Sequence, residues 1–415
     1  MTQVKLSLCI PTYNREIYLR NALEYCEGYD FSFPYEIVIS DNASTDGTGA
    51  VVEEFIARGL PIRYFRRETN GGSGPNLMNA FHHAVGEYSL YLADDDLLIA
   101  DGVENAIRHL DAHPDVVACH APWTIYNEVE GRDLSQFYAV AEDRTYPRRD
   151  FLEVFCFLFE GHVFPEIAIY RSSALRSAWV PREFAFWAFS YLAHFLDQGA
   201  VSFLAQPFYR SVAVSKLAAT RQQAGHDDVM TSWDRYRGGL EYFLYIAAKR
   251  GAIDTSDESR AVFEQMCRHF TLVRMSVAVR FWHASKDYIK AYELCTRMIW
   301  GGQGDNSDIA KIAESLPTLV ALQVLAGKIS DTTGLTRLIV DGKTDIEHLA
   351  DLLYDVGMPQ HIAVIASDTA AEGDLLIEES VVFVSEEADR AAYEAKGYRP
   401  TLIFSDHDLT QHVLL

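Results

Sequence analysis

The sequence predicts an α/β fold in which a largely parallel sheet is flanked by helices. Over the first 125 residues, short apolar runs alternate with segments of helical periodicity, which is the pattern of repeated strand–helix units. Polar motifs follow directly after three of the apolar runs, at the places where the chain would leave the carboxyl edge of such a sheet. Long helical patterns dominate after residue 215, and short apolar runs return from residue 361.

The apolar and helical runs of the N-terminal part predict its elements in order. We expect strands at residues 5–10, 36–40, 62–65 and 88–92, and helices at residues 16–26, 48–58 and 76–85. Pro11 is expected to end the first strand, because proline lacks the N–H that a strand ladder uses. The aromatic stretch at residues 151–208 is interpreted as a packed core layer rather than an exposed platform.

The length of the chain, 415 residues, predicts two or three domains. We place one domain at residues 1–215, a helical region at 216–330 and a small α/β module at 331–415. The module is expected to hold strands at 362–367, 381–385 and 401–405 and a helix at 386–396. These last two parts carry no catalytic spacing, so the roles considered for them are acceptor recognition, homo-oligomer formation and contact with a partner enzyme.

The charge and the cysteines limit the partners and the compartment. A net charge of −23 argues against binding to nucleic acid or to an anionic membrane surface. Six scattered cysteines without paired spacing indicate reduced thiols. No secretory signal is evident, and the weakly polar stretch at residues 316–327 is shorter than the roughly 20 residues that span a bilayer. We therefore expect a cytoplasmic protein without a transmembrane segment, with peripheral attachment to the inner face of the membrane kept open.

The strongest signal for function is a set of three motifs, each after a predicted strand. The motifs are Pro11-Thr12-Tyr13-Asn14-Arg15, then the nine residues SDNASTDGT at 40–48, and then ADDDLL at 93–98. Three consecutive aspartates repel one another, and a bound cation would relieve that repulsion. Asp94 and Asp96 offer hard oxygen ligands, which suit Mg²⁺ or Mn²⁺.

These motifs resemble glycosyltransferase family 2, whose members share a PTYNR-like start, a DNxSxDGT segment and a DxD or DD metal motif. The resemblance is strong over about 125 residues and fades toward Pro207-Phe208-Tyr209-Arg210. It implies the GT-A fold, a Rossmann-like mixed sheet flanked by helices. Asn76 and Asn79 stand where many members have an arginine, and this form resembles the subset that modifies bacterial surface polysaccharides.

The resemblance also implies roles for single residues. Asp41 should accept the N3–H of the nucleotide base, Tyr13 should stack on the base, and Pro11 and Thr12 should shape the same pocket. The remaining residues expected to bind the nucleotide sugar are Arg15, Asn76, Asp94 and Asp95. The Gly-rich loop at residues 70–76 permits a close approach of backbone N–H groups to the site.

The catalytic base is the point where this sequence departs from the family. The usual carboxylate position falls on Trp187-Ala188. Glu183 and Glu166 are the leading substitutes, and His194 and Asp197 remain alternatives. His226, which precedes two aspartates, is interpreted as part of a helix cap in preference to a metal ligand.

Together these features predict an enzyme that moves a sugar from a nucleoside-diphosphate sugar, with UDP favoured, to a hydroxyl group of a glycan or lipid-linked acceptor. The divalent cation would neutralise the departing diphosphate. Two alternatives stay open. One is a nucleotidyltransferase, which usually has a basic Gly-rich loop after the first strand; the other is a non-catalytic sugar-nucleotide-binding or assembly subunit, because the usual base is missing.

Overall fold

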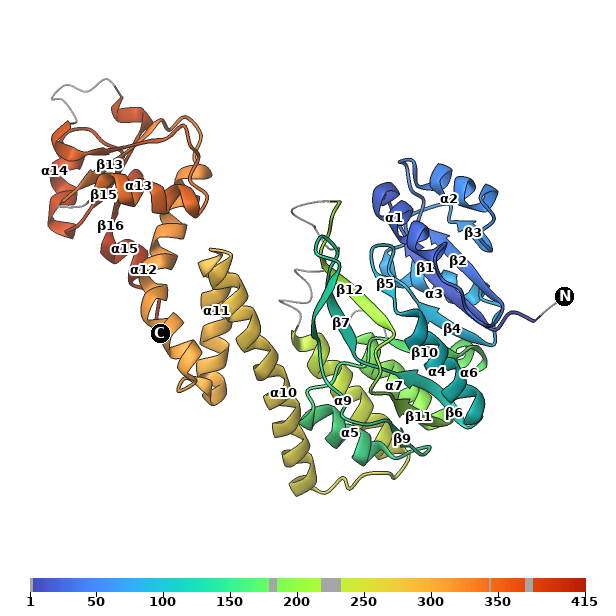
Figure 1. Cartoon of the computed structure of the whole chain (residues 1–415). Coiled ribbons are helices and arrows are strands. Elements are labelled where there is room, and N and C mark those ends of the chain that lie inside the picture. The colour runs from blue at the N-terminus through green and yellow to red at the C-terminus, as the bar shows by residue number, and fades with distance from the viewer. Residues whose placement is uncertain (1–2, 179–184, 218–232, 343–344, 370–375) are drawn as a thin grey trace. The chain divides into compact units, whose positions relative to one another are not determined.

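The computed structural model describes residues 3–178, 185–217, 233–342, 345–369 and 376–415. The chain forms two compact units, Met1–Thr271 and Leu272–Leu415 (Figure 1). The boundary lies inside helix α10 (Asp257–Ala284). The helical stretch at 216–330 is therefore shared between the two units, and this division differs from the three parts expected from the sequence.

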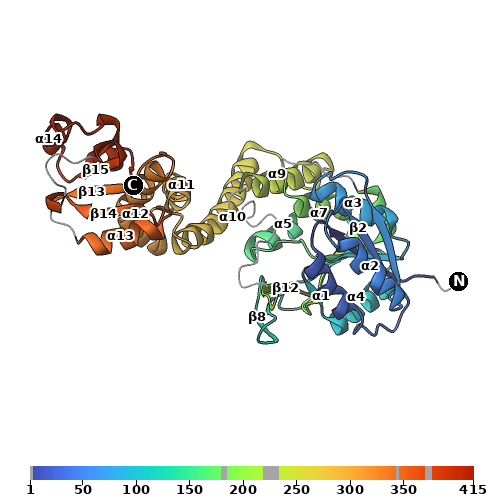
Figure 2. The same cartoon turned by 90° about the horizontal axis from the view of Figure 1, so that it is seen from above.

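The N-terminal unit is built around an eight-stranded mixed sheet. Its strand order is β3-β2-β1-β4-β10-β6-β11-β9, and β1 to β4 run parallel while β10 and β9 run antiparallel to their neighbours. Figure 2 shows α3 on one face of this sheet and α1 and α2 on the other. The strands of the large sheet are β1 (Leu6–Thr12), β2 (Tyr35–Asp41), β3 (Ile62–Arg66), β4 (Tyr88–Tyr91), β6 (Val116–His120), β9 (Arg144–Tyr146), β10 (Ala168–Arg171) and β11 (Ala200–Phe203).

The helices of this unit bury the apolar faces that their periodicity predicts. Val51, Val52 and Phe55 of α2 are at most 1% exposed, and the aromatic stretch packs inside as expected, with Phe189 and Phe195 fully buried. The described helices of the unit are α1 (Glu16–Cys26), α2 (Thr48–Ala57), α3 (Ser73–His83), α4 (Ala100–Ala112), α5 (Phe151–Glu160), α6 (Ser172–Ser177), α7 (Trp187–Gln198) and α9 (Trp233–Lys249).

Two expected boundaries were wrong. Pro11 does not end β1, because the strand runs on to Thr12 and pairs in register with Ser40 and Asp41. A proline is tolerated there near the end of the strand, where one missing N–H costs little of the ladder. Helix α3 begins at Ser73 rather than at residue 76, so the Gly-rich loop already contributes to its first turn.

A second, four-stranded sheet lies beside the large one. Its order is β5-β12-β7-β8, formed by Leu97–Leu98, Tyr209–Val214, Trp123–Asn127 and Arg132–Gln136. β5 directly follows the three aspartates, and it pairs with β12 through Tyr209 opposite Leu98. This sheet therefore fixes the segment after the aspartates to a strand more than a hundred residues later.

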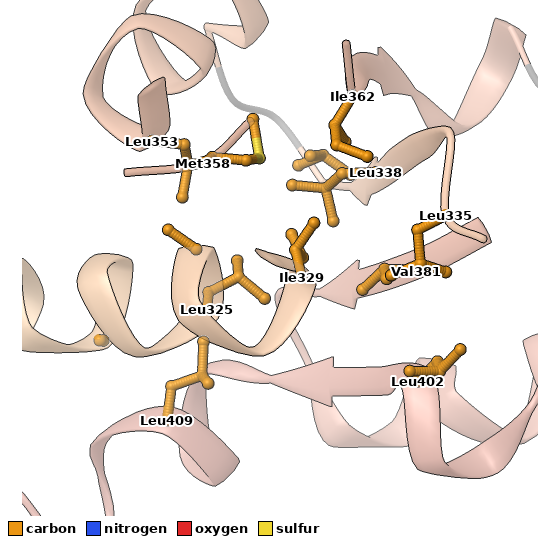
Figure 3. Close-up of a cluster of buried hydrophobic side chains, with 13 residues drawn as sticks. Leu325, Ile329, Leu335, Leu338, Leu353, Met358, Ile362, Val381, Leu402 and Leu409 are labelled. Carbon is orange, nitrogen blue, oxygen red and sulfur yellow. The ribbon is translucent and has the colours of Figure 1, made fainter. Parts of the chain in front are cut away.

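The C-terminal unit contains a parallel sheet with the order β14-β13-β15-β16. Leu325 and Ile329 of α12 point into the core above this sheet, together with Leu338, Val381 and Leu353 (Figure 3). The main elements are α11 (Tyr288–Met298), α12 (Ser307–Ser330), β13 (Arg337–Asp341), α13 (Ile346–Asp355), β14 (Ala363–Ala366), β15 (Ser380–Val384), α14 (Arg390–Ala395), β16 (Ile403–Ser405) and α15 (Asp406–Thr410); short turns of π-helix (Ile299–Gln303) and 3₁₀-helix (Ser367–Thr369, Ile377–Glu379, Glu387–Asp389, Pro400–Leu402) connect them.

Helix α12 is longer than its most apolar stretch suggested. It has 24 residues, and among the described residues it is the one helix with the length and composition to cross a membrane. The same properties belong to core helices of soluble proteins, and Leu316, Leu325 and Ile329 of α12 are at most 2% exposed. The stretch at residues 316–327 is thus the inner part of a longer helix, and the expected absence of a transmembrane segment stays a prediction.

Candidate functional site

The three sequence motifs meet at the carboxyl edge of the large sheet. Thr12 Oγ1, at the end of β1, donates a hydrogen bond of 2.7 Å to Asp94 Oδ2, after β4. Asn14 Oδ1 accepts a hydrogen bond of 2.7 Å from the backbone N–H of Thr45, in the second motif. β1 lies between β2 and β4 and runs parallel to both, so the turns that follow these three strands leave the sheet side by side at the same edge.

The three aspartates hold different contacts although they are consecutive. Asp94 and Asp96 are each 8% exposed. Asp96 Oδ2 accepts a hydrogen bond of 3.0 Å from the Tyr209 hydroxyl, and Asp96 Oδ1 accepts one of 2.9 Å from the Val212 N–H. Both oxygens of Asp96 thus face donors from β12, and this residue anchors the turn to the second sheet.

Arg15 lies against the other two aspartates. Its Nε is 3.3 Å from Asp94 Oδ1, and its terminal nitrogen pairs with Asp95 Oδ2. The guanidinium also lies over the Tyr18 ring, 4.0 Å from the centroid. The side chains of Arg15, Asp94 and Asp95 are 17%, 11% and 10% exposed, so this is a partly buried ion-pair cluster at the strand ends.

Asp41 is placed at the site but fully buried. Its Oδ2 accepts a hydrogen bond of 2.5 Å from the Tyr64 hydroxyl, and its Oδ1 accepts one of 2.8 Å from the Ser44 N–H. Burial, followed by the bond to Asp41, raises the pKa of Tyr64, so its hydroxyl stays protonated as a donor. Arg66 Nε is 3.7 Å from Asp41 Oδ2. A base that bonded to Asp41 would have to move Tyr64 or Arg66, so the predicted role of Asp41 stays a prediction.

Asn76 lies inside the fold rather than on its surface. Its Nδ2 donates to the carbonyl oxygens of Thr12 and Ser40, at 3.1 and 2.9 Å, and its Oδ1 accepts from the Ser40 hydroxyl at 2.7 Å. The residue is 3% exposed. Asn76 therefore links the ends of β1 and β2 by hydrogen bonds, like a clamp. Its expected contact with a nucleotide sugar stays a prediction.

Tyr13 and Pro11 border this clamp on the solvent side. Tyr13 is 43% exposed, which leaves its ring accessible for stacking, and Pro11 is half-buried. A cavity of about 550 Å³ opens at the end of β3 and along α3, and its size lies in the range of small-molecule sites. Its lining is formed by Arg66, Arg67, Glu68, Thr69, Pro75, Met78, Asn79 and His82.

Glu166 lies at the same edge of the sheet as the aspartates. β10 runs antiparallel to β4 with Ile169 opposite Leu90, so β10 begins at the edge where β4 ends, and Glu166 lies two residues before its first residue, Ala168. Burial raises the pKa of Tyr91, and the negative charges of Asp96, Asp94 and Glu166 add to this shift. Glu166, Asp94 and Asp96 therefore act electrostatically on the same tyrosine.

The other candidates for the base are less well placed or undescribed. Glu183 and His226 lie outside the described residues. Asp197 forms ion pairs with Arg149 and Arg250, and His194 Nε2 lies 3.2 Å from the Tyr242 hydroxyl. Trp187 and Ala188 begin α7, and Ala188 is 1% exposed. Of the two leading candidates, the structure describes Glu166 and brings it to the site.

The aspartates have the donor chemistry that a divalent cation needs. Within the described part of the chain, no three His, Cys, Asp or Glu side chains form a metal-binding group. Mg²⁺ is usually held by one or two carboxylates together with substrate phosphates and water. Asp94 and Asp95, whose carboxylates pair with Arg15, fit this pattern. The oxygens of Asp96 accept hydrogen bonds from Tyr209 and Val212, and the expected ligand role of Asp96 stays a prediction.

Some residues of the site were not predicted from the sequence. Tyr209 was noted within the late motif, but its bonds to Asp96 and to the Ala93 N–H follow from strand pairing across the second sheet. Tyr64 was missed because it appears in the sequence as an ordinary strand residue, and only the pairing of β2 with β3 brings it to Asp41.

Comparison with known proteins agrees with this arrangement. The model of the family described as glycosyl transferase family 2 matches residues 7–179. Abequosyltransferase RfbV of Salmonella typhimurium is 34% identical over 143 residues, which are 34% of this chain and 43% of that protein. A β-1,3-glucosyltransferase of Campylobacter jejuni that acts on GalNAc(5)-diNAcBac-PP-undecaprenol is 28% identical over 184 residues, which are 43% of this chain and 56% of that protein.

The chain thus spans less than two thirds of the length of these two relatives. Among solved structures, residues 1–349 of TarS from Staphylococcus aureus, in complex with UDP-GlcNAc, are similar at a TM-score of 0.48 and 20% identity, over 77% of this chain and 85% of that one. The family match covers the described turns after β1, β2 and β4. Over residues 7–179 this chain is similar to glycosyl transferase family 2.

Proposed function

We propose that the protein transfers a sugar from a nucleoside-diphosphate sugar to a hydroxyl group of a bacterial glycan or lipid-linked acceptor. The observation that carries this proposal is the junction of Thr12, Arg15 and Asp94, which joins the first and third motifs at the edge where α/β sheets bind ligands. The family match gives the reaction class. A UDP-sugar is the favoured donor.

In this proposal, different accessible residues bind different parts of the donor nucleotide sugar. The ring of Tyr13 is exposed for stacking on the base, and the cavity beside Arg66 and Asn79 receives the nucleoside end. Arg15 binds the diphosphate, because a guanidinium fork suits phosphate oxygens. Asp94 and Asp95 hold a divalent cation, Mg²⁺ or Mn²⁺, and this cation supplies positive charge to the leaving diphosphate.

Glu166 is the group we assign to the acceptor proton. An attacking hydroxyl must lose its proton, and a carboxylate within hydrogen-bond reach can accept it. Glu166 lies just before β10, at the edge of the sheet where β4 ends, whereas the family's usual position is occupied by Trp187 and Ala188. Glu183 stays the second candidate.

The replacement of the usual base also supports a second candidate function. A subunit that binds sugar nucleotides without turnover would keep Tyr13, Arg15 and the aspartates and would dispense with the base. Both functions are compatible with a cytoplasmic protein that attaches peripherally to the inner face of the membrane.

The test combines binding and turnover. The purified chain should bind UDP in calorimetry more tightly with Mn²⁺ than with EDTA, and it should release UDP from at least one UDP-sugar of a panel when an acceptor extract is present. Asp95→Asn should abolish the Mn²⁺ dependence of binding, whereas Asp133→Asn, which removes an acid paired with Arg210 in the second sheet, should not. Binding without release across the panel would favour the non-catalytic function, and Mn²⁺-independent binding would refute the assigned metal site.

A further inference from the structure

Arg15 occupies the place where positive charge is needed when no metal is bound. Two adjacent carboxylates, each about one-tenth exposed, lie at the end of a buried strand, and the guanidinium pairs with both of them. Like charges this close raise the free energy of the ionised pair unless a cation compensates them. Arg15 supplies that compensation from within the chain.

The position of Arg15 is fixed from several sides. Its backbone N–H donates to Thr48 Oγ1 at 3.3 Å, which links it to the second motif. Its guanidinium lies on the Tyr18 ring, in a geometry that favours a cation. The fork thus faces Asp94 and Asp95 in an ordered position before any ligand binds.

A divalent cation at Asp94 and Asp95 would lie beside this guanidinium, and the two positive charges would repel each other. The bidentate fork of arginine also suits phosphate oxygens as well as carboxylates. A diphosphate next to the cation would therefore offer Arg15 a new partner.

We propose that Arg15 is a built-in counter-ion that competes with the divalent cation and that couples metal binding to diphosphate binding. This inference rests on the proposed function. Without nucleotide, Arg15 stays on the aspartates and weakens metal binding. With nucleotide, it turns to the diphosphate and leaves the aspartates to the metal, so that each ligand strengthens the other by the same factor.

The experiment measures Mn²⁺ affinity of the full chain by electron paramagnetic resonance, with MnCl₂ alone and with saturating UDP. Arg15→Gln should bind Mn²⁺ alone more tightly than wild type by at least about fivefold, the lower end of typical coupling between sites. UDP should tighten Mn²⁺ binding in wild type and much less in Arg15→Gln. Arg15→Lys keeps the charge and should stay close to wild type with MnCl₂ alone.

Arg20→Gln is the matched control, because Arg20 lies on α1, which directly follows Arg15, and pairs with the exposed Glu54 instead. It should leave both affinities unchanged. Unchanged binding of Mn²⁺ alone by Arg15→Gln, or weaker binding by a variant that stays folded, would overturn the inference. Misfolding cannot produce the expected result, because it would weaken Mn²⁺ binding. If wild type bound neither Mn²⁺ with UDP nor UDP itself, the proposed function would fail first, and the inference with it.

Discussion

Single residues decide the chemistry at the carboxyl edge of the large sheet. Thr12, Arg15, Asp94 and Asp95 come from two separate strand ends, yet Thr12 and Arg15 contact the two aspartates directly. Asp96 differs from its two neighbours because Tyr209 and Val212 hold its oxygens. The same residue type thus pairs with Arg15 at two positions and with β12 at the third.

Replacement of Glu166 tests the proposed base. Glu166→Gln should lower turnover by at least about a hundredfold, the usual contribution of a positioned base, and should leave UDP affinity unchanged. Glu153→Gln, on the exposed side of α5, is the control and should turn over as wild type. Steady-state UDP release measures both. Normal turnover of Glu166→Gln would transfer the role to Glu183, His194 or Asp197, or to a retaining mechanism.

His120 makes the stability of the N-terminal unit dependent on pH. Burial lowers its pKa from 6.5 to about 3. The unfolded chain takes up a proton below its ordinary pKa and the folded chain does not, so the free energy of unfolding falls as pH drops, by up to about 1.4 kcal/mol per pH unit. His120→Phe keeps the ring stacked on Phe203 and should show a shallower dependence between about pH 6 and 4. Denaturant titrations at several pH values measure it; parallel curves for variant and wild type would exclude this role.

At the scale of elements, two sheets share the turn that carries the aspartates. β4 leads into the turn from the large sheet, and β5 leads out of it into the small one. Tyr209 on β12 joins the two, because its hydroxyl donates to Asp96 and accepts from the Ala93 N–H at 3.1 Å. Burial, followed by the charge of Asp96, raises the pKa of Tyr209, which keeps the hydroxyl protonated.

Tyr209→Phe should loosen this turn. It removes one hydrogen-bond partner from the buried Asp96 carboxylate and from the part-buried Ala93 N–H, which costs about 1–3 kcal/mol of unfolding free energy. Mn²⁺ affinity in the presence of UDP should fall as well, because the aspartates are less well ordered. Tyr126→Phe, in the neighbouring strand β7, is the control for loss of a hydroxyl in the same sheet and should change neither quantity. Equal effects of the two variants would argue against a specific anchor.

At the scale of the whole molecule, the two units have separate cores. The core of the C-terminal unit includes Leu325, Ala326 and Ile329 of α12 (Figure 3). The helical stretch at residues 216–330, which was expected to form a region of its own, is thus divided between the two units. Its last part, the end of α12, packs on the C-terminal sheet. The role of the C-terminal unit in acceptor recognition, in homo-oligomer formation or in contact with a partner enzyme stays a prediction.

Truncation tests this division. A chain ending at Thr271 should unfold cooperatively and bind UDP as the full chain does, because the N-terminal unit keeps its own core. A chain ending at Ser330 should bind UDP but expose the apolar residues of α12 that the small sheet normally covers, and so it should aggregate more readily. Calorimetry and light scattering measure the two properties. A folded 1–271 chain without UDP affinity would place part of the site in the C-terminal unit.

The sequence alone determined the alternation of strands and helices in the N-terminal part and the order of its three motifs. Apolar periodicity is a property of consecutive residues, so the bounds of β1 to β4 and α1 to α3 were predicted from it to within a few residues. The positions of the polar turns were also predicted, because each turn comes directly after a strand in the sequence. The family match to residues 7–179 confirms the resemblance that these motifs indicated.

Only the tertiary structure decided which of these residues touch. Strand β13 (Arg337–Asp341), central in the C-terminal sheet, was missed because five apolar and polar residues after a long helical pattern give little signal. The second sheet joins strands distant in sequence, so its anchor from Tyr209 to Asp96 has no local signature. The pairing of Arg15 with Asp94 and Asp95 likewise spans about eighty residues. Such contacts depend on strand order, which the folding of the whole unit sets and no local segment encodes.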